Sequence, residues 1–203
     1  GGKGFNARAH AANFGIEELA EAIRLAHILD VSVYVTVNIL IGDSELKALE
    51  AYLKDLERIG VDAIIVQDLA VAKLAQRVAP KLHLHGSTQM TAATLDAVHF
   101  YESLGFTRVV LARELSLPEI EHICKNCTAE IEVFVHGALC VCYSGQCLMS
   151  SFIGGRSGNR GACAQPCRLP YELLDSSGTS LLPKHEAYLL SPKDLNYSEH
   201  MNE

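Results

Sequence analysis

The chain has 203 residues, of which 49% are hydrophobic and 20% charged, and its formal net charge is −7. This composition is typical of a globular domain and excludes a disordered chain. The acidic balance disfavours a free-standing nucleic-acid module, and the apolar runs are too short for a membrane helix. No signal segment opens the chain, so we expect its seven cysteines to occupy a reducing, cytoplasmic compartment as metal ligands or catalysts.

Strand-like and helix-like segments alternate along the first 137 residues. Runs rich in β-branched residues predict strands, and apolar residues at helical spacing predict helices. Ser44 is a plausible N-cap of the second helix, and Gly60 ends it. The expected strands are 31–40, 63–67, 82–85, 108–112 and 130–136. The expected helices are 16–29, 44–59, 70–78, 91–104 and 117–125.

This alternation predicts an α/β fold in which helices cover parallel strands. A repeat of about 25–30 residues suits a TIM-type (β/α) barrel or an open doubly wound sheet. No Gly-x-Gly-x-x-Gly turn follows a strand, which argues against a dinucleotide-binding Rossmann domain. Five strands are too few for a closed barrel, so we expect a barrel truncated at both ends.

Three segments are expected along the chain. Residues 1–137 would form the partial barrel, and residues 138–170 a Cys-rich cluster-binding loop. Residues 171–203 would form a β-hairpin insertion, with its turn at 176–178, and the start of the next barrel segment. A further short strand is expected at 188–190.

Polar side chains stand at the end of each predicted strand. In parallel barrels the carboxyl ends of the strands carry the chemistry, so these side chains predict a pocket for a polar ligand. The alternative is that strand ends are polar because they face solvent. The predicted pocket residues are Asn38, Gln67, Asp68, Ser87, Thr88 and Gln89.

Four further strand-end residues are candidates for catalysis. Arg113 can bind a carboxylate or phosphate through its planar guanidinium group, and Glu114 is either a second reactive group or the salt-bridge partner of Arg113. His85 and His136 can transfer protons near neutral pH. Taken alone, each histidine is more often a hydrogen-bonded structural residue than a catalytic one.

A cluster of cysteines follows the last predicted strand, at Cys140, Cys147, Cys163 and Cys167. Zinc sites commonly use paired Cys-x-x-Cys knuckles, whereas iron–sulfur clusters take thiolates from more irregular loops. The spacing therefore favours a 4Fe–4S cluster over zinc. Spacing alone leaves open whether Cys142 replaces Cys140 as a ligand.

The segment EVFVHGALCVCYSGQCLMS resembles the signature of the collagenase-like peptidases, peptidase family U32. The likeness extends to residues 1–9, 87–89, 157–161, 163–168 and 190–195. It implies a (β/α) barrel and an iron–sulfur enzyme for oxygen-independent hydroxylation of tRNA uridine, rRNA cytidine or ubiquinone precursors.

For the RNA-directed branch, the resemblance implies tRNA or rRNA as the substrate and prephenate or a similar small carboxylate as the hydroxyl source. A homologous partner subunit is also implied, and no membrane partner is expected. Some relatives carry a cysteine directly after the Lys-Asp-Leu motif, where this chain has Asn196. We therefore expect Cys167 to be the fourth ligand, with Cys142 or a non-cysteine group as alternatives.

Two other functions compete with RNA hydroxylation. An endopeptidase needs a nucleophile with a base or a metal-activated water, and neither a Gly-x-Ser-x-Gly nor a His-Glu-x-x-His motif is present. A cysteine protease based on Cys140 and His136 conflicts with the cluster, because a thiolate bound to iron cannot attack a peptide. A non-catalytic iron–sulfur carrier needs no pocket, so the polar strand ends argue against it.

Overall fold

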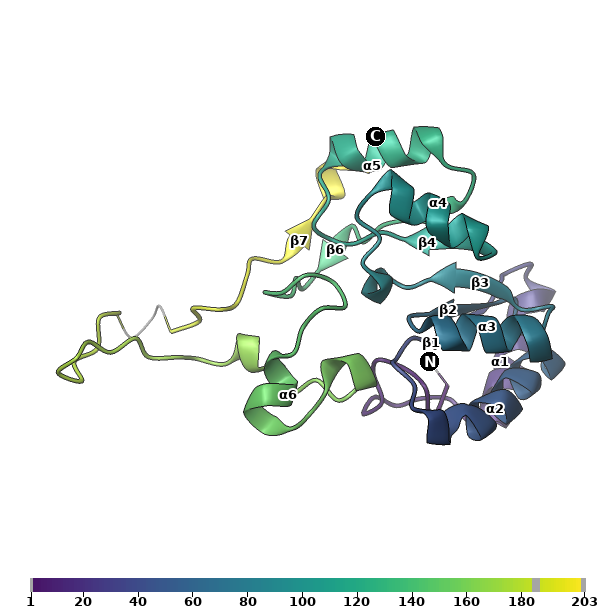
Figure 1. Cartoon of the computed structure of the whole chain (residues 1–203), viewed down its shortest axis with the longest axis horizontal. Coiled ribbons are helices and arrows are strands. Elements are labelled where there is room, and N and C mark those ends of the chain that lie inside the picture. Colours follow the sequence, from purple (N-terminus) through teal and green to yellow (C-terminus); the bar gives the residue numbers. More distant parts are fainter. Residues whose placement is uncertain (1, 184–186, 202–203) are drawn as a thin grey trace.

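The computed structural model describes residues 2–183 and 187–201, and it is an α/β fold built on a five-stranded parallel sheet (Figure 1). The strands are β1 (Tyr34–Val37), β2 (Ala63–Val66), β3 (His83–Gly86), β4 (Phe106–Val110) and β5 (Glu130–Glu132). Their order in the sheet is their order in the chain. Because right-handed crossovers between consecutive parallel strands all return on the same side, this order predicts helices on one face only.

The helices do pack on one face of the sheet. They are α1 (Ile16–Ile28), α2 (Leu46–Arg58), α3 (Leu69–Val78), α4 (Leu95–Ser103) and α5 (Leu117–Asn126). Alternate strand residues such as Val37 and Val66 point to this face and join the apolar sides of the helices. In α2, Leu49, Leu53 and Leu56 repeat at helical spacing and are fully buried. None of the helices in the described ranges has both the length and the apolar character needed to cross a bilayer.

The opposite face of the sheet is polar. Neighbouring strands place His85, Arg108 and Glu130 in one row on this face. Arg108 forms ion pairs with Glu130 and Glu132, and its guanidinium group lies 5.0 Å from the centre of the Tyr34 ring. A parallel sheet with helices on one side only is the layer arrangement of a (β/α) barrel. The α/β prediction is confirmed, and closure into a barrel stays a prediction.

Most predicted elements agree with the structure to within about two residues at each end. The first strand is shorter than predicted, because Asn38 Oδ1 accepts a 3.0 Å hydrogen bond from the Ala7 N–H and ties the chain to the N-terminal segment. The fourth helix begins later than predicted, at Leu95, because the Thr94 hydroxyl caps its first turn at 3.2 Å.

Two other predictions are wrong in detail. The last predicted strand divides, since β6 (His136–Gly137) leaves the main sheet and pairs antiparallel with β7 (Leu195–Asn196). Ser44 is not an N-cap but lies within a 3-10 turn, Asp43–Glu45. The Glu45 carboxylate caps this turn instead, because it accepts a 2.8 Å hydrogen bond from the backbone N–H of Gly42, the residue before the turn.

Residues 138–170, called the Cys segment below, were expected to form a loop. They contain a short helix, α6 (Met149–Gly154), and 3-10 turns at Gly158–Arg160 and Pro166–Arg168. The segment lies across the carboxyl ends of β1 and β3, where its backbone and side chains bind the turns that follow these strands. The predicted cysteine region is therefore a folded element that rests on the sheet.

An arm of residues 171–183 and 187–190 projects away from the sheet (Figure 1). The predicted hairpin lies here, but it is reduced to one antiparallel bridge between Leu174 and Ser180. Residues 188–190 form no strand, so this prediction is wrong.

Candidate functional site

Two glycines let the Cys segment approach the sheet closely. Gly145 has a φ of +77°, and a Cβ atom there would lie 2.0 Å from the backbone oxygen of Gln89, just after β3. Gly161 has a φ of +75°, and its Cβ atom would lie 2.3 Å from the backbone oxygen of Asn6. Glycine alone accepts this left-handed backbone together with so close a contact. These contacts fix the position of the Cys segment over the strand ends.

Arg113 and Glu114, which follow β4, also fasten the Cys segment. Arg113 Nη1 donates to the Ala138 carbonyl at 2.9 Å, and Nη2 lies 3.7 Å from Cys140 Sγ. Glu114 Oε1 accepts hydrogen bonds from the backbone N–H and the hydroxyl of Ser144, at 2.9 and 3.1 Å. Among the described ion pairs, none joins Arg113 to Glu114, so the alternative of a salt bridge between them is wrong. Their catalytic roles stay predictions.

Two arginines join the Cys segment to its neighbours. Arg160 donates to both carboxylate oxygens of Glu45, at 2.6 and 2.9 Å, and this hydrogen-bonded pair lowers the pKa of Glu45 to about 2. Arg168 donates to the Leu139 carbonyl and to the Ser191 hydroxyl, each at 2.7 Å. The segment is thereby tied to the turn after β1 and to the chain that leads into β7.

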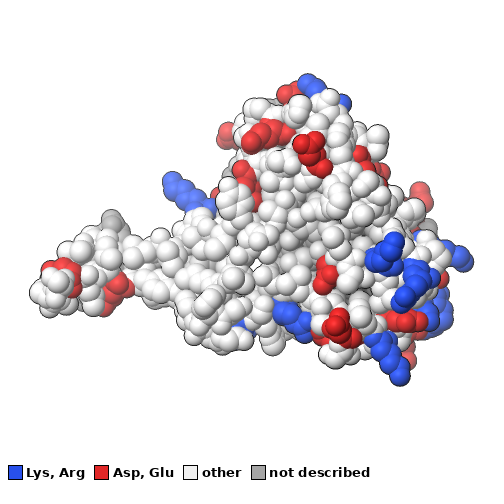
Figure 2. Space-filling view, in the orientation of Figure 1, with Lys and Arg blue, Asp and Glu red and all other residues white. Residues whose placement is uncertain are grey.

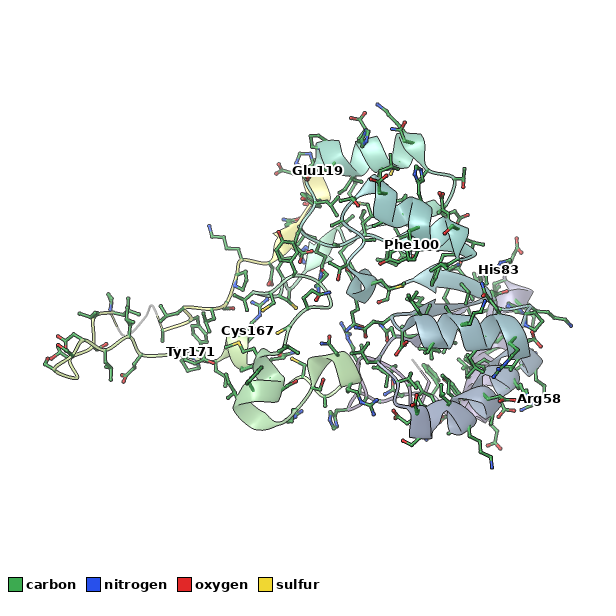
Figure 3. All side chains as sticks on the ribbon, viewed as in Figure 1. Arg58, His83, Phe100, Glu119, Cys167 and Tyr171 are labelled. Carbon is green, nitrogen blue, oxygen red and sulfur yellow. The ribbon has the colours of Figure 1, made fainter. Side chains whose placement is uncertain are left out.

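Five thiols gather in the Cys segment, around the labelled Cys167 (Figure 3). Burial and a hydrogen bond with Cys147 raise the pKa of Cys142, and the nearby Cys140 and Cys167 raise it further. Burial also raises the pKa of Cys167, and the nearby Cys140 and Cys163 raise it further. Cys140, Cys147 and Cys167 therefore lie near Cys142, and Cys163 lies near Cys167.

Polar N–H groups point at two of the sulfur atoms. Besides the Arg113 contact to Cys140, the Gln165 backbone N–H donates to Cys163 Sγ at 3.3 Å. Such donors stabilise thiolate charge, which a metal ligand carries. In the described ranges, no three His, Cys, Asp or Glu side chains converge closely enough to hold a metal ion. The donor chemistry fits a thiolate-bound centre, and the ligand set stays a prediction.

The two predicted histidines lie in different surroundings. His85 is 5% exposed and meets the Tyr34 ring edge-on at 4.6 Å. Burial, helped by the nearby Arg108, lowers the pKa of His85 to about 4, so the ring is neutral at neutral pH. Proton transfer by His85 near neutral pH therefore does not fit its surroundings. His136 is exposed on β6, opposite Asn196, and its role stays a prediction.

Four of the six predicted pocket residues hold backbone turns. Asn38 and Asp68 accept hydrogen bonds from backbone N–H groups, at 3.0 Å for Asn38 and at 2.8 and 2.9 Å for Asp68. Ser87 Oγ accepts one from the Gln89 N–H at 3.2 Å, and Thr88 Oγ1 donates to a carbonyl at 3.0 Å. These residues shape the strand ends, and the side-chain oxygens that form these hydrogen bonds are already used there.

Gln67 and Gln89 remain, and both line a cavity of about 320 Å³ between the sheet and the Cys segment. This cavity is called the amide cavity below. Its lining residues are Leu40, Gln67, Gln89, Gly145, Gln146, Leu148 and Asn159. Of the six predicted pocket residues, only the two glutamines line this cavity, and residues of the Cys segment form the rest of its lining.

The sequence did not predict Gln146, Leu148 or Asn159 as pocket residues. They lie in the Cys segment, for which the spacing of the cysteines predicted a metal centre and no pocket residues. The available signal was Gly145, since an isolated glycine in a polar segment indicates close approach of the backbone to another group.

Charge is unevenly distributed over the surface. On the face shown in Figure 2, acidic and basic side chains gather over the helices, and the middle of the face is mainly uncharged.

Sequence comparison covers the chain from end to end. The family described as "Peptidase family U32" matches residues 1–203. The chain belongs to peptidase family U32. The resemblance seen in the residues around Cys140 and Cys147 is thereby confirmed.

Several curated relatives of this U32 chain carry names that refer to RNA, including one from Escherichia coli and one from Bacillus subtilis. The 23S rRNA 5-hydroxycytidine C2501 synthase of Escherichia coli (strain K12) is 45% identical over 194 residues, covering 96% of this chain and 29% of the relative. The tRNA hydroxylation protein P1 of Bacillus subtilis (strain 168) is 40% identical over 203 residues, covering 98% of this chain and 48% of the relative. The U32 chain therefore spans less than half the length of either relative.

A solved structure supports the fold of the U32 chain. The U32 peptidase Mk0906 matches with a TM-score of 0.54 at 17% identity, covering 66% of this chain and 57% of that chain. At this identity the likeness concerns the arrangement of strands and helices.

Proposed function

We propose that this U32 chain carries the cluster and base-binding part of an enzyme that hydroxylates RNA. The observation that supports this most is the amide cavity, which lies between the strand ends and a segment that holds five thiols. A redox centre beside a polar pocket suits an enzyme better than an electron carrier, which needs no pocket. The names of the two RNA-directed relatives point the same way.

The proposed cofactor is a 4Fe–4S cluster held by Cys140, Cys147, Cys163 and Cys167, with zinc as the alternative. When bound, such a cluster supplies electron transfer at a potential tuned by hydrogen bonds to sulfur. Here the Arg113 guanidinium and the Gln165 N–H would supply those bonds. Cys142 competes with Cys167 for the fourth position, because both lie among the other thiols.

The proposed co-substrate is prephenate or a similar small carboxylate, and the proposed substrates are tRNA or rRNA. A homologous partner subunit and a cytoplasmic location complete the proposal. Arg113 is the candidate to bind the carboxylate, although part of its guanidinium group already binds Ala138.

Proteolysis is the second candidate function, because both the family and a solved structure similar to this chain are named as peptidases. The serines near His136 do not favour it. Ser144 is 2% exposed and bonded to Glu114, and the Ser150 hydroxyl accepts a hydrogen bond from the Ala164 N–H at 2.9 Å. The Ser144 hydroxyl ties the Cys segment to Glu114, and the Ser150 hydroxyl bonds within the segment, which leaves neither as an exposed nucleophile.

Anaerobic purification of the full-length protein tests the cluster. We expect a coloured protein with bound iron and sulfide, and we expect Cys147→Ala to lose most of the iron. Cys124→Ala is the matched control, because Cys124 is an exposed thiol on α5 that lies outside the Cys segment. A colourless wild-type protein without iron would remove the cluster from the proposal.

Mass spectrometry of RNA tests the reaction. We expect a deletion strain to lose a hydroxylated pyrimidine from tRNA or rRNA, and Cys124→Ala but not Cys147→Ala to restore it. Unchanged hydroxylation in the deletion strain would refute the RNA function. Cleavage of casein or collagen by the purified protein, lost in Cys140→Ala and His136→Ala, would favour proteolysis instead.

A further inference from the structure

Two segments of this acidic chain contain no acidic residue. They are residues 1–15, which precede α1, and the Cys segment, so all 24 Asp and Glu residues lie elsewhere. The Cys segment carries three arginines, and residues 1–15 carry Lys3 and Arg8. Both segments are therefore basic, although the net charge of the whole chain is −7.

The fold brings these two basic segments into contact (Figure 1). A Cβ atom at Gly161 would lie 2.3 Å from the backbone oxygen of Asn6, and Arg8 is only two residues from Asn6. On the other segment, Arg156 Nε donates to the Ala162 carbonyl at 3.0 Å, which places this guanidinium group beside Gly161. Arg8 and Arg156 therefore flank one contact, and the two segments form a continuous basic surface.

Arg8 and Arg156 are free to bind an anion. Both are exposed, and within the described residues neither forms an ion pair. The Arg8 side chain forms no hydrogen bond in this part of the chain, and Arg156 uses only Nε, on a neutral carbonyl. The other two arginines of the Cys segment are paired with carboxylates. An arginine without an acidic partner offers a full charge and several N–H donors, which suit a phosphate group.

An aromatic ring lies on the same surface. Phe152 in α6 is 86% exposed, the highest fraction among the exposed large hydrophobic residues that the structure describes. The Arg156 N–H donates to the Ser150 carbonyl at 3.2 Å and so ties this arginine to the end of α6. Surfaces that combine arginines with exposed aromatic rings bind single-stranded nucleic acids, because the cations contact phosphates and the bases stack on the rings.

Resting on the proposed RNA function, we propose that a single-stranded stretch of RNA binds across Arg8, Phe152 and Arg156, called the RNA surface below. The two guanidinium groups bind phosphates, and the Phe152 ring stacks on a base. A duplex keeps its bases stacked inside and offers no free base to the ring, so the RNA surface favours loops and other unpaired regions. Cys163 directly follows Ala162, which places a strand bound here beside the proposed cluster.

Fluorescence anisotropy of the full-length protein tests this assignment, with a labelled single-stranded RNA of about 12 nucleotides as the probe at a series of salt concentrations. Arg8→Gln and Arg156→Gln should each reduce the magnitude of the slope of log K against log salt by about 0.7, because each removes one phosphate contact. Phe152→Ala should weaken binding by at least about fivefold and leave the slope unchanged. Arg77→Gln and Phe100→Ala are the matched controls, since both residues are exposed on the helices α3 and α4. Both controls should bind as the wild type does.

Thermal unfolding and size-exclusion chromatography separate RNA binding from contact with protein. Because the ring is 86% exposed, Phe152→Ala should unfold at the temperature of the wild type and elute at the same volume. Weaker RNA binding in a variant of unchanged stability and size supports the assignment. A lower unfolding temperature or a changed oligomeric state would overturn it, since the ring would then pack against another part of the protein or a partner.

Three other results would also overturn the assignment. They are no binding of the single strand by the wild type, equal binding of a duplex of the same sequence, and unchanged binding in all three variants of the RNA surface. The deletion strain tests the proposed function separately. If RNA hydroxylation is unchanged there while RNA binding depends on Arg8, Phe152 and Arg156, the proposed reaction fails and the RNA surface stands.

Discussion

Replacing Gly145 by alanine tests how firmly the Cys segment is fixed to the sheet. The added Cβ atom would lie 2.0 Å from the backbone oxygen of Gln89, in a residue whose φ is +77°. The left-handed backbone alone costs an alanine about 1–2 kcal/mol, and crowding a packed site costs about 1–3 kcal/mol more. The contact is with backbone, so no side-chain rotation relieves it. We expect the free energy of unfolding to fall by about 2–5 kcal/mol.

Chemical denaturation and hydrogen–deuterium exchange of the full-length protein measure this effect. We expect Gly145→Ala to speed exchange in the Cys segment more than in α2. Gly154→Ala is the matched control, because its Cβ atom would meet nothing within 4 Å. It should change the free energy of unfolding by less than about 1 kcal/mol. If both variants unfold alike, and exchange in the Cys segment is unchanged, the contact with Gln89 does not hold the segment.

Two further changes test His85 and Glu114. Burial lowers the pKa of His85 from 6.5 to about 4, so the folded state favours the neutral ring. The contribution of His85 to the free energy of unfolding is therefore complete above pH 6.5 and declines as the pH falls toward 4. His85→Gln should flatten this decline by up to about 3 kcal/mol in urea denaturation at a series of pH values; an unchanged decline would contradict the assignment. Glu114→Met removes the acceptor for both donors of Ser144 and should lower the free energy of unfolding by about 1–3 kcal/mol. In a double-mutant cycle with Ser144→Ala, strictly additive losses would show that the two side chains do not interact.

Periodicity predicted the sheet and its helices well, because local burial decides both. The leucines of α2 are spaced for one buried side, and they are fully buried in the structure. The ends of elements were harder to predict, since they depend on distant partners. Asn38, for example, ends β1 by binding Ala7, and nothing near position 38 indicates that partner.

Only the part of the candidate site that the sheet positions could be predicted from the sequence. Parallel strands bring their ends together, so Gln67 and Gln89 could be placed in one pocket from the sequence. Asn159 could not, because its place depends on the path of the Cys segment. That path is set by contacts such as Arg160 with Glu45, which are far apart in the chain.

The arm that projects from the sheet leaves and returns at nearly the same place. Arg168 binds Ser191 at its base, and the Tyr171 N–H donates to the Ala187 carbonyl at 2.7 Å. With both ends held, the length of the arm has little influence on the rest of the fold, since doubling a flexible loop costs only about 0.6 kcal/mol. The tip of the arm, at Ser177 and Gly178, is therefore a place where an affinity tag or a fluorophore can be inserted without disturbing the thiols.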